Sequence, residues 1–414
     1  MKVSTTQKNI FSSLIGNLVF AFGQYLLLIL FIKFFSKAEV GMYLFALAFV
    51  APISLAMDLQ LRTLYVTENN SKVKFSDYYS YRIITNIVSV IILVIGILVY
   101  RNQYFAIVLI LTLIRAVESH IDLLYGVYQQ KYRLDFVAKS KIIRTVISLV
   151  SVFLTVLITE NLIYSLYAYL FVWVGLYLLF EKRNVIKKNF LESSDFKFRW
   201  DKINLKYLLI QTSPLVFAIL VNKYYSNYPR IAIESFLSLG DLAIFGSLLY
   251  FKTLASQIIS AVGQATTPNL MGFLVKRDYL NFKKLLNKLI LFGFSLGILG
   301  IVIVYFFGEF TLSLLYSEEY AKYNEVLILI LLGAAITFSY IYIGTAITCL
   351  RKQWIKLPIS ALGLILIIAL FYAIKPINLM VVAYIILAVE TVMFLLYFGT
   401  YKLYINNVIQ KNFK

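Results

Sequence analysis

Apolar stretches recur along the whole sequence, and each is long enough to cross a membrane as a helix. A helix needs about 20 predominantly apolar residues to span the hydrocarbon core of a bilayer, and we identify twelve such stretches. Composition agrees, because 61% of the 414 residues are hydrophobic and 14% are charged, whereas soluble domains have about 25% charged residues. The sequence therefore predicts an all-α polytopic membrane protein with about 12 transmembrane helices. The stretches begin near Ile10, Glu39, Tyr79, Tyr104, Phe136, Leu162, Leu205, Leu239, Lys283, Asn324, Ile355 and Asn378.

The distribution of the 39 Lys and Arg residues predicts the orientation of these helices. With the N-terminus placed in the cytoplasm, 30 of them fall on the cytoplasmic side, 7 on the outer side and 2 within helices. The segment from Lys131 to Arg144 supplies five of the cytoplasmic ones. Because cytoplasmic segments of membrane proteins are enriched in Lys and Arg, we expect both termini to be cytoplasmic. The net charge of +19 then reflects topology and attraction to anionic lipid, not nucleic-acid binding.

The longest polar break divides the chain into two halves. It is also the most basic break, and we expect it to be a cytoplasmic linker between two lobes of six helices each. A frame of Ser-x-x-acid-aliphatic-small-x-aromatic occurs at residues 36–43 and again at 238–245, just before the second helix of each half. This repeat favours a parallel pseudo-two-fold relation between the halves. The predicted parts are an N-terminal lobe at 1–181, a linker at 182–204, a C-terminal lobe at 205–404 and a cytoplasmic tail at 405–414.

Lys252 lies within the eighth apolar stretch, near the depth expected for the bilayer centre. A charged side chain there costs roughly 2.5–3.5 kcal/mol on insertion scales and normally faces a bundle interior or a wet cavity. Helical spacing gives Ser256 and Gln264 a place on the same polar face as Lys252. We therefore expect Lys252 to line a pocket. Glu390, near mid-depth in the last stretch, could pair with a cation, be protonated or bind a coupling ion.

The fourth apolar stretch is the most charged, with Arg115, Glu118, His120 and Asp122. Helical spacing places Arg115, Glu118 and Asp122 on one face and directs His120 away from it. Two interpretations remain open. Arg115 and Glu118 either compensate each other as an i, i+3 pair, or Arg115 faces a cavity and binds phosphate, with Glu118 or Asp122 as a titratable partner. His120 is expected to be a packing residue.

Polar residues in or beside three other stretches are candidates for contacts with a ligand. Asn17 and Gln24 lie on one face of the first helix, and Gln211 lies in the seventh. These residues either make hydrogen bonds between helices or line a cavity for sugar hydroxyls. Arg62 follows the second stretch. It is either an interfacial anchor or a cation that reaches an anionic group from the cytoplasmic side.

Several chemistries are excluded by residues that the sequence lacks. With one cysteine and one histidine, neither a disulfide within the chain nor a Cys- or His-based metal site is expected. The motifs GxxxxGK[ST] and HExxH are also absent, which removes the corresponding ATP-binding and metalloprotease sites. The outer segments are short for a glycan polymerase or ligase. We therefore expect a transporter that is not an enzyme and has no cofactor and no metal.

Three segments carry a resemblance to a known family. The first is GNLVFAFGQYLLLILFIKFFSKAEVGMYLFALAFVAP near the N-terminus, the second is DLQLRTLYVTE from Asp58 to Glu68, and the third is YFKTLASQIISAVGQATTPNL from Tyr250 to Leu270. They resemble the opening helix pair, the end of helix two and helix eight of the Wzx-type polysaccharide repeat-unit flippases. These flippases form a branch of the multidrug/oligosaccharidyl-lipid/polysaccharide exporter superfamily.

The resemblance implies a function. Such a protein moves an undecaprenyl-diphosphate-linked oligosaccharide of a capsule, O-antigen or exopolysaccharide from the cytoplasmic to the outer leaflet of the bacterial cytoplasmic membrane, by alternating access. Cations line the cavities of the family, and the matching positions here are Arg62 and Lys252, while Arg115 is a candidate from its own placement. Polymerases and glycosyltransferases of the same pathway would be partners. A cation-coupled multidrug antiporter of the same fold, or a membrane glycan polymerase or ligase, are the alternatives.

Overall fold

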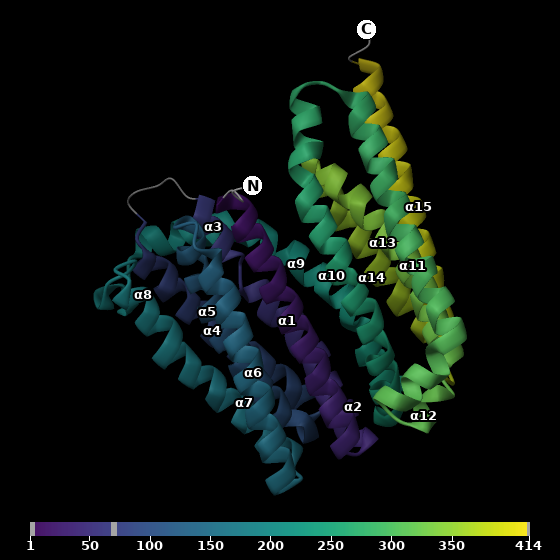
Figure 1. Cartoon of the computed structure of the whole chain (residues 1–414), viewed down its shortest axis with the longest axis horizontal. Helices are drawn as coiled ribbons and strands as arrows, with labels where there is room; N and C mark the ends of the chain where they lie inside the picture. Colours follow the sequence, from purple (N-terminus) through teal and green to yellow (C-terminus); the bar gives the residue numbers. More distant parts are fainter. Residues whose placement is uncertain (1–4, 68–72, 412–414) are drawn as a thin grey trace. The chain divides into compact units, whose positions relative to one another are not determined.

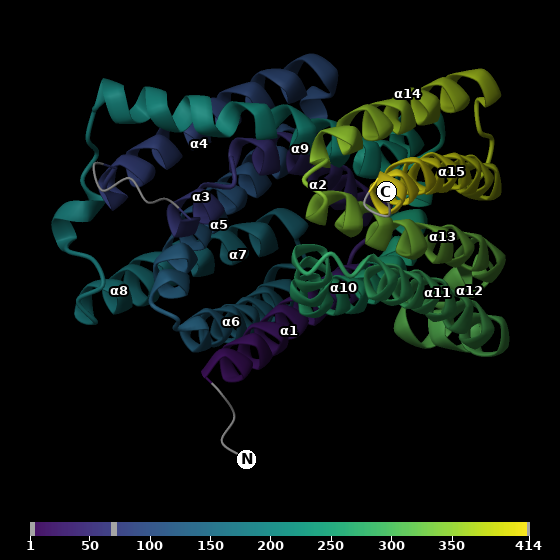
Figure 2. The ribbon, with the colours of Figure 1, turned by 90° about the horizontal axis from the view of Figure 1, so that it is seen from above.

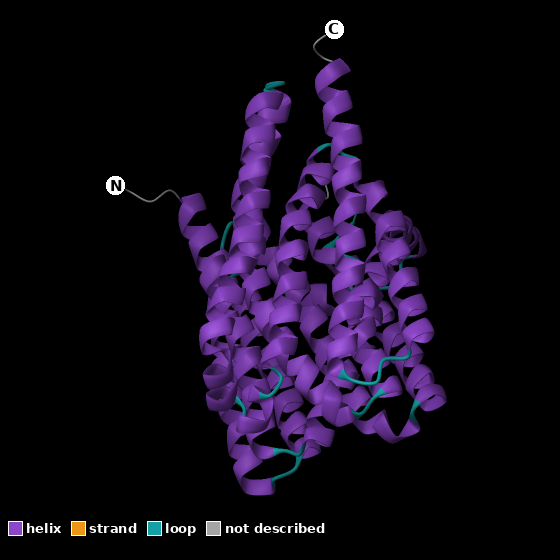
Figure 3. Cartoon of the chain, turned by 90° about the vertical axis from the view of Figure 1, so that its right-hand side faces the viewer, coloured by secondary structure: helices purple, strands orange, loops and turns teal. Residues whose placement is uncertain are grey.

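The structure is a computed structural model that describes residues 5–67 and 73–411. These residues form helices joined by short loops, and no strand occurs among them (Figure 3). The helices, labelled in Figure 1, are α1 (Thr5–Phe34), α2 (Lys37–Met57), α3 (Leu61–Thr67), α4 (Phe75–Tyr100), α5 (Phe105–Gln130), α6 (Leu134–Thr159), α7 (Leu162–Leu176), α8 (Arg183–Lys187), α9 (Lys202–Phe236), α10 (Leu239–Val275), α11 (Tyr279–Leu315), α12 (Glu318–Ala321), α13 (Asn324–Cys349), α14 (Lys356–Ile374) and α15 (Leu379–Lys411). The shorter turns are η1 (Asn102–Tyr104), a π-helical turn η2 (Tyr177–Lys182), η3 (Ser193–Phe196) and η4 (Gln353–Ile355).

Most of these helices are long and apolar enough to cross a membrane. In the described part of the chain, ten candidate spans meet this condition, or eleven if the bent pair Lys202–Ser213 and Val216–Phe236 counts as one. The expectation of an all-helical, multi-pass membrane protein is therefore confirmed. α10 and α11 have 37 residues each, so they are longer than the predicted spans of about 20 residues. α5 has 26 residues and is not among the ten, because three of its residues are charged.

The two copies of the repeated sequence frame form the same local structure. Ser36 precedes α2 and accepts a hydrogen bond from the backbone amide of Glu39 at 3.3 Å. Ser238 precedes α10 and accepts one from the amide of Asp241 at 3.0 Å. Serine caps the free amides at a helix N-terminus, and the acid three residues later complements the helix dipole. The frame is therefore a helix-start signal in both places.

The chain divides into two compact units, residues 1–223 and 224–414. The division falls within α9, later in the chain than the predicted linker at 182–204. In unit 1, α1 packs along α6 (Figure 1). Glycine allows this close approach, since a Cβ atom on Gly16 would lie 2.7 Å from the Cα atom of Ala138, and one on Gly23 would overlap the Thr145 side chain. This packing places the face of α6 that carries Ala138 and Thr145 against α1.

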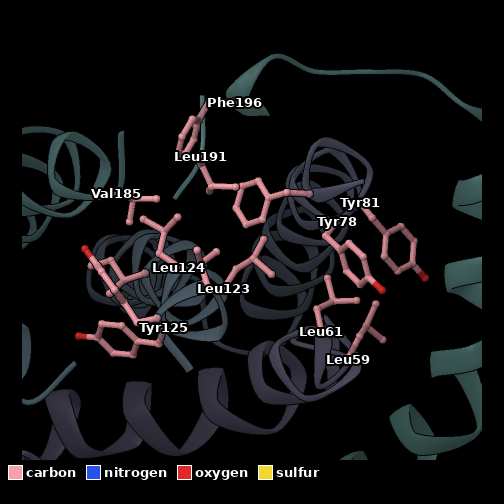
Figure 4. Close-up of a cluster of buried hydrophobic side chains, with 14 of the residues drawn as sticks. Leu59, Leu61, Tyr78, Tyr81, Leu123, Leu124, Tyr125, Val185, Leu191 and Phe196 are labelled. Atoms are coloured by element: carbon pink, nitrogen blue, oxygen red, sulfur yellow. The ribbon is translucent and has the colours of Figure 1, made fainter. Parts of the chain in front are cut away.

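A cluster of buried apolar side chains holds the break after α2 and the segment after α7 against α4 and α5. Figure 4 shows its members gathered around these helices. Leu61 lies in α3 and is fully buried, while Phe196 lies in η3. The cluster fixes the position of α3, and with it that of Arg62. The labelled members are Leu59, Leu61, Tyr78, Tyr81, Leu123, Leu124, Tyr125, Val185, Leu191 and Phe196.

In unit 2, α13 is the most enclosed of the described helices that could span a membrane. It packs against α10, α11 and α15, which surround it when the unit is seen end-on (Figure 2). A Cβ atom on Gly293 of α11 would lie 2.6 Å from the Phe338 carbonyl oxygen, and one on Gly297 would overlap Ala335. Small residues at these positions let the two helix backbones approach closely.

Candidate functional site

A charged cavity of about 260 Å³ lies within unit 1. Helices α1, α2, α5 and α6 contribute to its wall. Three cations and three carboxylates face it, which is unusual inside a membrane protein because buried charges there are costly. The lining residues are Phe20, Leu55, Asp58, Arg115, Glu118, Ser119, Asp122, Tyr125, Lys141 and Arg144.

Two of the cations expected from the sequence contact carboxylates of α5. The Arg115 guanidinium lies 2.5 Å from Glu118, and the Arg62 guanidinium lies 3.0 Å from Asp122. Arg62 also donates to the Gln129 side chain at 3.1 Å. The positive charge of Arg115 and Arg62 is therefore compensated within unit 1, although both residues lie at or beside the cavity.

The third carboxylate reaches the cavity because α2 ends abruptly. Leu59 and Gln60 have φ angles of 53° and 48°, in a left-handed region that non-glycine residues seldom adopt. This turn stops α2 at Met57 and leaves Asp58 at the cavity wall. Arg82 of α4, fully buried, donates to Asp58 at 2.9 Å and to the Met57 carbonyl at 3.4 Å. A cation at this position complements the negative end of the helix dipole.

Lys141 and Arg144 are one turn apart on α6, and among the described residues neither contacts a carboxylate within salt-bridge distance. Lys141 donates to the Asn17 side chain at 2.5 Å. Arg144 is 3% exposed, and its Nε and Nη1 atoms have no hydrogen-bond partner in the described part of the chain. Its guanidinium lies 4.2 Å from the centre of the Trp173 ring. Sequence reasoning counted both residues with the cytoplasmic basic segment from Lys131 to Arg144 and did not consider them as site residues.

The remaining candidates of unit 1 do not share one environment. Gln24 donates to the Tyr169 hydroxyl at 2.8 Å. His120 packs between the rings of Tyr79 and Tyr177, at centroid distances of 5.3 and 5.7 Å. Gln211 is exposed on α9. The structure therefore brings Asn17 and Gln24 near the cations of α6, and it does not bring His120 or Gln211 there.

Unit 2 holds Lys252 in a network of its own. The Lys252 ammonium lies 3.1 Å from a Glu390 carboxylate oxygen and 3.1 Å from the Thr337 hydroxyl. The Tyr340 hydroxyl donates to the other Glu390 oxygen at 2.5 Å, and its ring stacks on that of Tyr397. Lys252 thus has a carboxylate partner from α15. The other polar candidates on α10 do not join this network. Ser256 donates to a carbonyl of its own helix, and Gln264 is exposed.

No group of three or more His, Cys, Asp or Glu side chains suitable for a metal ion occurs among residues 5–67 and 73–411.

Comparisons with known proteins identify the fold. No family model matches the chain. A capsular polysaccharide biosynthesis protein of Staphylococcus aureus, CapF, is 27% identical over 372 residues, which cover 89% of this chain and 92% of CapF. An inward-facing multidrug resistance MATE family transporter of the MOP superfamily superimposes with a TM-score of 0.76 at 13% identity, over 96% of both chains. The lipid II flippase MurJ, in an inward closed conformation, gives 0.72 at 14% identity, over 96% of this chain and 87% of MurJ.

The chain therefore has the fold of the transporters of the MOP superfamily, the multidrug/oligosaccharidyl-lipid/polysaccharide exporters. Together with the relationship to CapF, this confirms the resemblance to the polysaccharide flippases of that superfamily that the sequence indicated.

Proposed function

We propose that this protein is a flippase for a lipid-linked oligosaccharide. It moves an undecaprenyl-diphosphate-linked repeat unit from the cytoplasmic to the outer leaflet of the bacterial cytoplasmic membrane by alternating access. The observation that carries this proposal is the presence of Lys141 and Arg144 in the cavity of unit 1, without a carboxylate contact among the described residues. The relationship to a capsular polysaccharide biosynthesis protein supports a glycan as the cargo.

The charges around the cavity favour an anion. Arg62 and Arg82 contact cavity carboxylates, so five cations stand against the three carboxylates of the lining. A buried polar group without a hydrogen bond costs about 1–3 kcal/mol, and more when it is charged. A ligand that accepts hydrogen bonds from the Arg144 guanidinium would remove this cost. A diphosphate suits the site, because planar guanidinium groups bind phosphate oxygens in pairs and can replace their hydration.

The proposal also covers the topology, the contacts with the sugar and the partner proteins, which the fold alone does not establish. We assign α5 as a twelfth span, because the contacts of Arg115 and Asp122 compensate its charges. Both termini are then cytoplasmic, and the halves are related by a parallel repeat. Asn17, Gln24, Gln211, Ser256 and Gln264 remain the proposed partners of sugar hydroxyls. Flipping breaks no covalent bond, so the protein acts without enzymatic chemistry, and enzymes of the same polysaccharide pathway are its expected partners.

A cation-coupled multidrug antiporter is the second candidate, because the chain shares its fold with a multidrug resistance transporter. That function would use a membrane carboxylate to hold the drug or the coupling ion. Glu390 is buried, but it contacts the Lys252 ammonium at 3.1 Å. A coupling cation would have to displace this ammonium, and for that reason we prefer the flippase.

The test is a strain whose surface polysaccharide depends on this protein. Arg144→Ala and Lys141→Ala should reduce surface polymer and cause the lipid-linked precursor to accumulate in the cytoplasmic leaflet, at equal protein abundance. Lys139→Ala is the matched control, since Lys139 lies on the same helix but is exposed. Full polymer in Arg144→Ala would refute the site. If deletion of the protein left the polymer intact and raised drug sensitivity, the antiporter would be the better assignment.

A further inference from the structure

Glu181 is a buried carboxyl group close to the cavity that the proposed function does not use. It is 3% exposed and lies in η2, the π-helical turn after α7. A π-helical turn inserts an extra residue into a helix, and such turns are frequent at functional sites. The Ser140 hydroxyl donates to the Glu181 carboxylate. The turn therefore directs an acid toward Ser140 on α6.

Hydrogen bonds connect Glu181 with the cavity. The hydroxyls of Ser140 and Tyr125 lie 2.6 Å apart, and Tyr125 is part of the cavity wall. The centre of the Tyr125 ring lies 5.8 Å from the Lys141 ammonium and 6.0 Å from the Arg144 guanidinium. Tyr125, Ser140 and Glu181 thus form a continuous hydrogen-bonded route for a proton from the cavity wall to the buried acid.

The charge on Glu181 acts on Arg144. The groups facing Glu181 are Ser140 and Arg144 of α6 and the phenols of Tyr125 and Tyr128 of α5. Arg144 is the cation among them.

Two carboxylates, Glu118 and Glu181, lie close enough to interact with Arg144. Glu118 is already engaged by Arg115 at 2.5 Å. The ionised form of Glu181 is stabilised by the hydrogen bond from Ser140 and by the charge of Arg144, because a buried charge is costly unless hydrogen bonds and an opposite charge compensate it.

We propose that Glu181 is the proton-binding site that controls anion binding in this cavity. While Glu181 is ionised, part of the positive potential of Arg144 is neutralised. When a proton from the cavity reaches Glu181 through Tyr125 and Ser140, the carboxyl becomes neutral and Arg144 is free to bind an anion. By linkage, the proton and the anion then favour each other's binding to an equal extent. The inference rests on the proposed function, in which the anion is the diphosphate of the lipid carrier.

The experiment uses Trp173, which stacks on Arg144, as a fluorescent reporter. The chain has three tryptophans, and Trp200 and Trp354 are exposed, so Trp200→Phe and Trp354→Phe leave Trp173 alone. The full-length protein in phosphatidylcholine nanodiscs is titrated with inorganic pyrophosphate at about pH 5.5 and about pH 8. Glu181→Gln, which mimics the neutral acid, is titrated in parallel. Because the probe's own protonation is common to both proteins, it cancels in the comparison.

We expect the ratio of the Kd values at the two pH values to be larger in the unmodified background than in Glu181→Gln, by on the order of tenfold. At the higher pH, Glu181→Gln should bind pyrophosphate more tightly than the background. If Glu181→Gln does not fold, Ser140→Ala serves instead. It removes the donor to the ionised carboxylate, so it should move the midpoint of the pH dependence upward.

The outcomes separate this inference from the proposed function. Equal pH ratios in the background and in Glu181→Gln would overturn the inference and leave the anion site standing. Loss of the pH dependence in Glu118→Gln but not in Glu181→Gln would overturn it as well. If pyrophosphate does not change Trp173 fluorescence at either pH, the cavity is not an anion site, and the site assigned under the proposed function fails together with the inference.

Discussion

The contact between Lys252 and Glu390 gives a quantitative prediction about unit 2. The side chains of Lys252 and Glu390 are 23% and 7% exposed. Removing one partner of a buried ion pair costs about 3–5 kcal/mol, because the other charge is left buried and uncompensated. Since water reaches part of Lys252, we expect the lower limit, about 3 kcal/mol, for Lys252→Met. For a domain of this size, that corresponds to a fall in Tm of about 6–12 °C.

The double variant separates the energy of the interaction between Lys252 and Glu390 from the contribution of each side chain alone. Replacement of both partners of a buried pair by neutral groups is often close to neutral, so Lys252→Met combined with Glu390→Gln should recover most of the lost stability. The interaction energy in the double-mutant cycle should be about 2–3 kcal/mol. Thermal unfolding of the purified protein in detergent measures all four corners of the cycle. Lys276→Met, an exposed cation just after the same helix, is the control and should leave Tm unchanged.

Surface polysaccharide in the same variants tests the role of Lys252. If the pair is structural, transport should return in the double variant together with stability. If Lys252 binds substrate phosphate, as the resemblance implied, the double variant would be stable and inactive. A Lys252→Met protein as stable as the unmodified protein, or a double variant as unstable as Lys252→Met, would refute the pairing argument.

Three further predictions concern folding. Arg82→Met should lower the free energy of unfolding by about 2–3 kcal/mol, which thermal unfolding measures. This is below the range for a fully buried pair, because the Asp58 carboxylate that loses its partner is one-third exposed. Gly297→Ala should destabilise the packing of α11 on α13 by about 1–3 kcal/mol, whereas Gly300→Ala, with its nearest neighbour at 3.8 Å, should be tolerated. Hydrogen bonds from Asn281 lower the pKa of Asp278 below its usual range, so the cap of α11 should be complete above about pH 4 and be lost as the pH falls further; hydrogen exchange of the Asn281 amide against pH checks this.

Much of the architecture could be predicted from hydropathy. A span has to be long and apolar because the bilayer offers no hydrogen bonds, so the starts expected near Leu162, Leu239 and Asn324 coincide with observed helix starts. The internal charges were also informative. Arg115 contacts Glu118, and Lys252 contacts Glu390, two of the partners considered from the sequence.

The identity of the cavity cations could not be predicted in this way. Lys141 and Arg144 occur near the start of an apolar stretch, where long basic side chains ordinarily extend into the interfacial region. They face inward because α1 packs on α6 through Gly16 and Gly23, a contact between helices far apart in the chain. The break after α2 is similar, since Leu59 and Gln60 carry no turn signal and the turn is held by the burial of Leu59 and Leu61 in the cluster of Figure 4.

The two units differ in how their internal charges are balanced, and under the proposed function this difference favours unit 1 as the place where the substrate phosphate binds. In unit 2, the ammonium of Lys252 contacts a carboxylate, so a phosphate would have to compete with Glu390 for it. In unit 1, aromatic contacts position the Arg144 guanidinium, and no carboxylate of the described residues lies within salt-bridge distance of it. Trp173 is itself fixed by a hydrogen bond to Ser148 at 3.1 Å. A cation that is oriented without a salt bridge is the arrangement that an anion-binding site requires, and in the described residues it occurs on α6 rather than on α10.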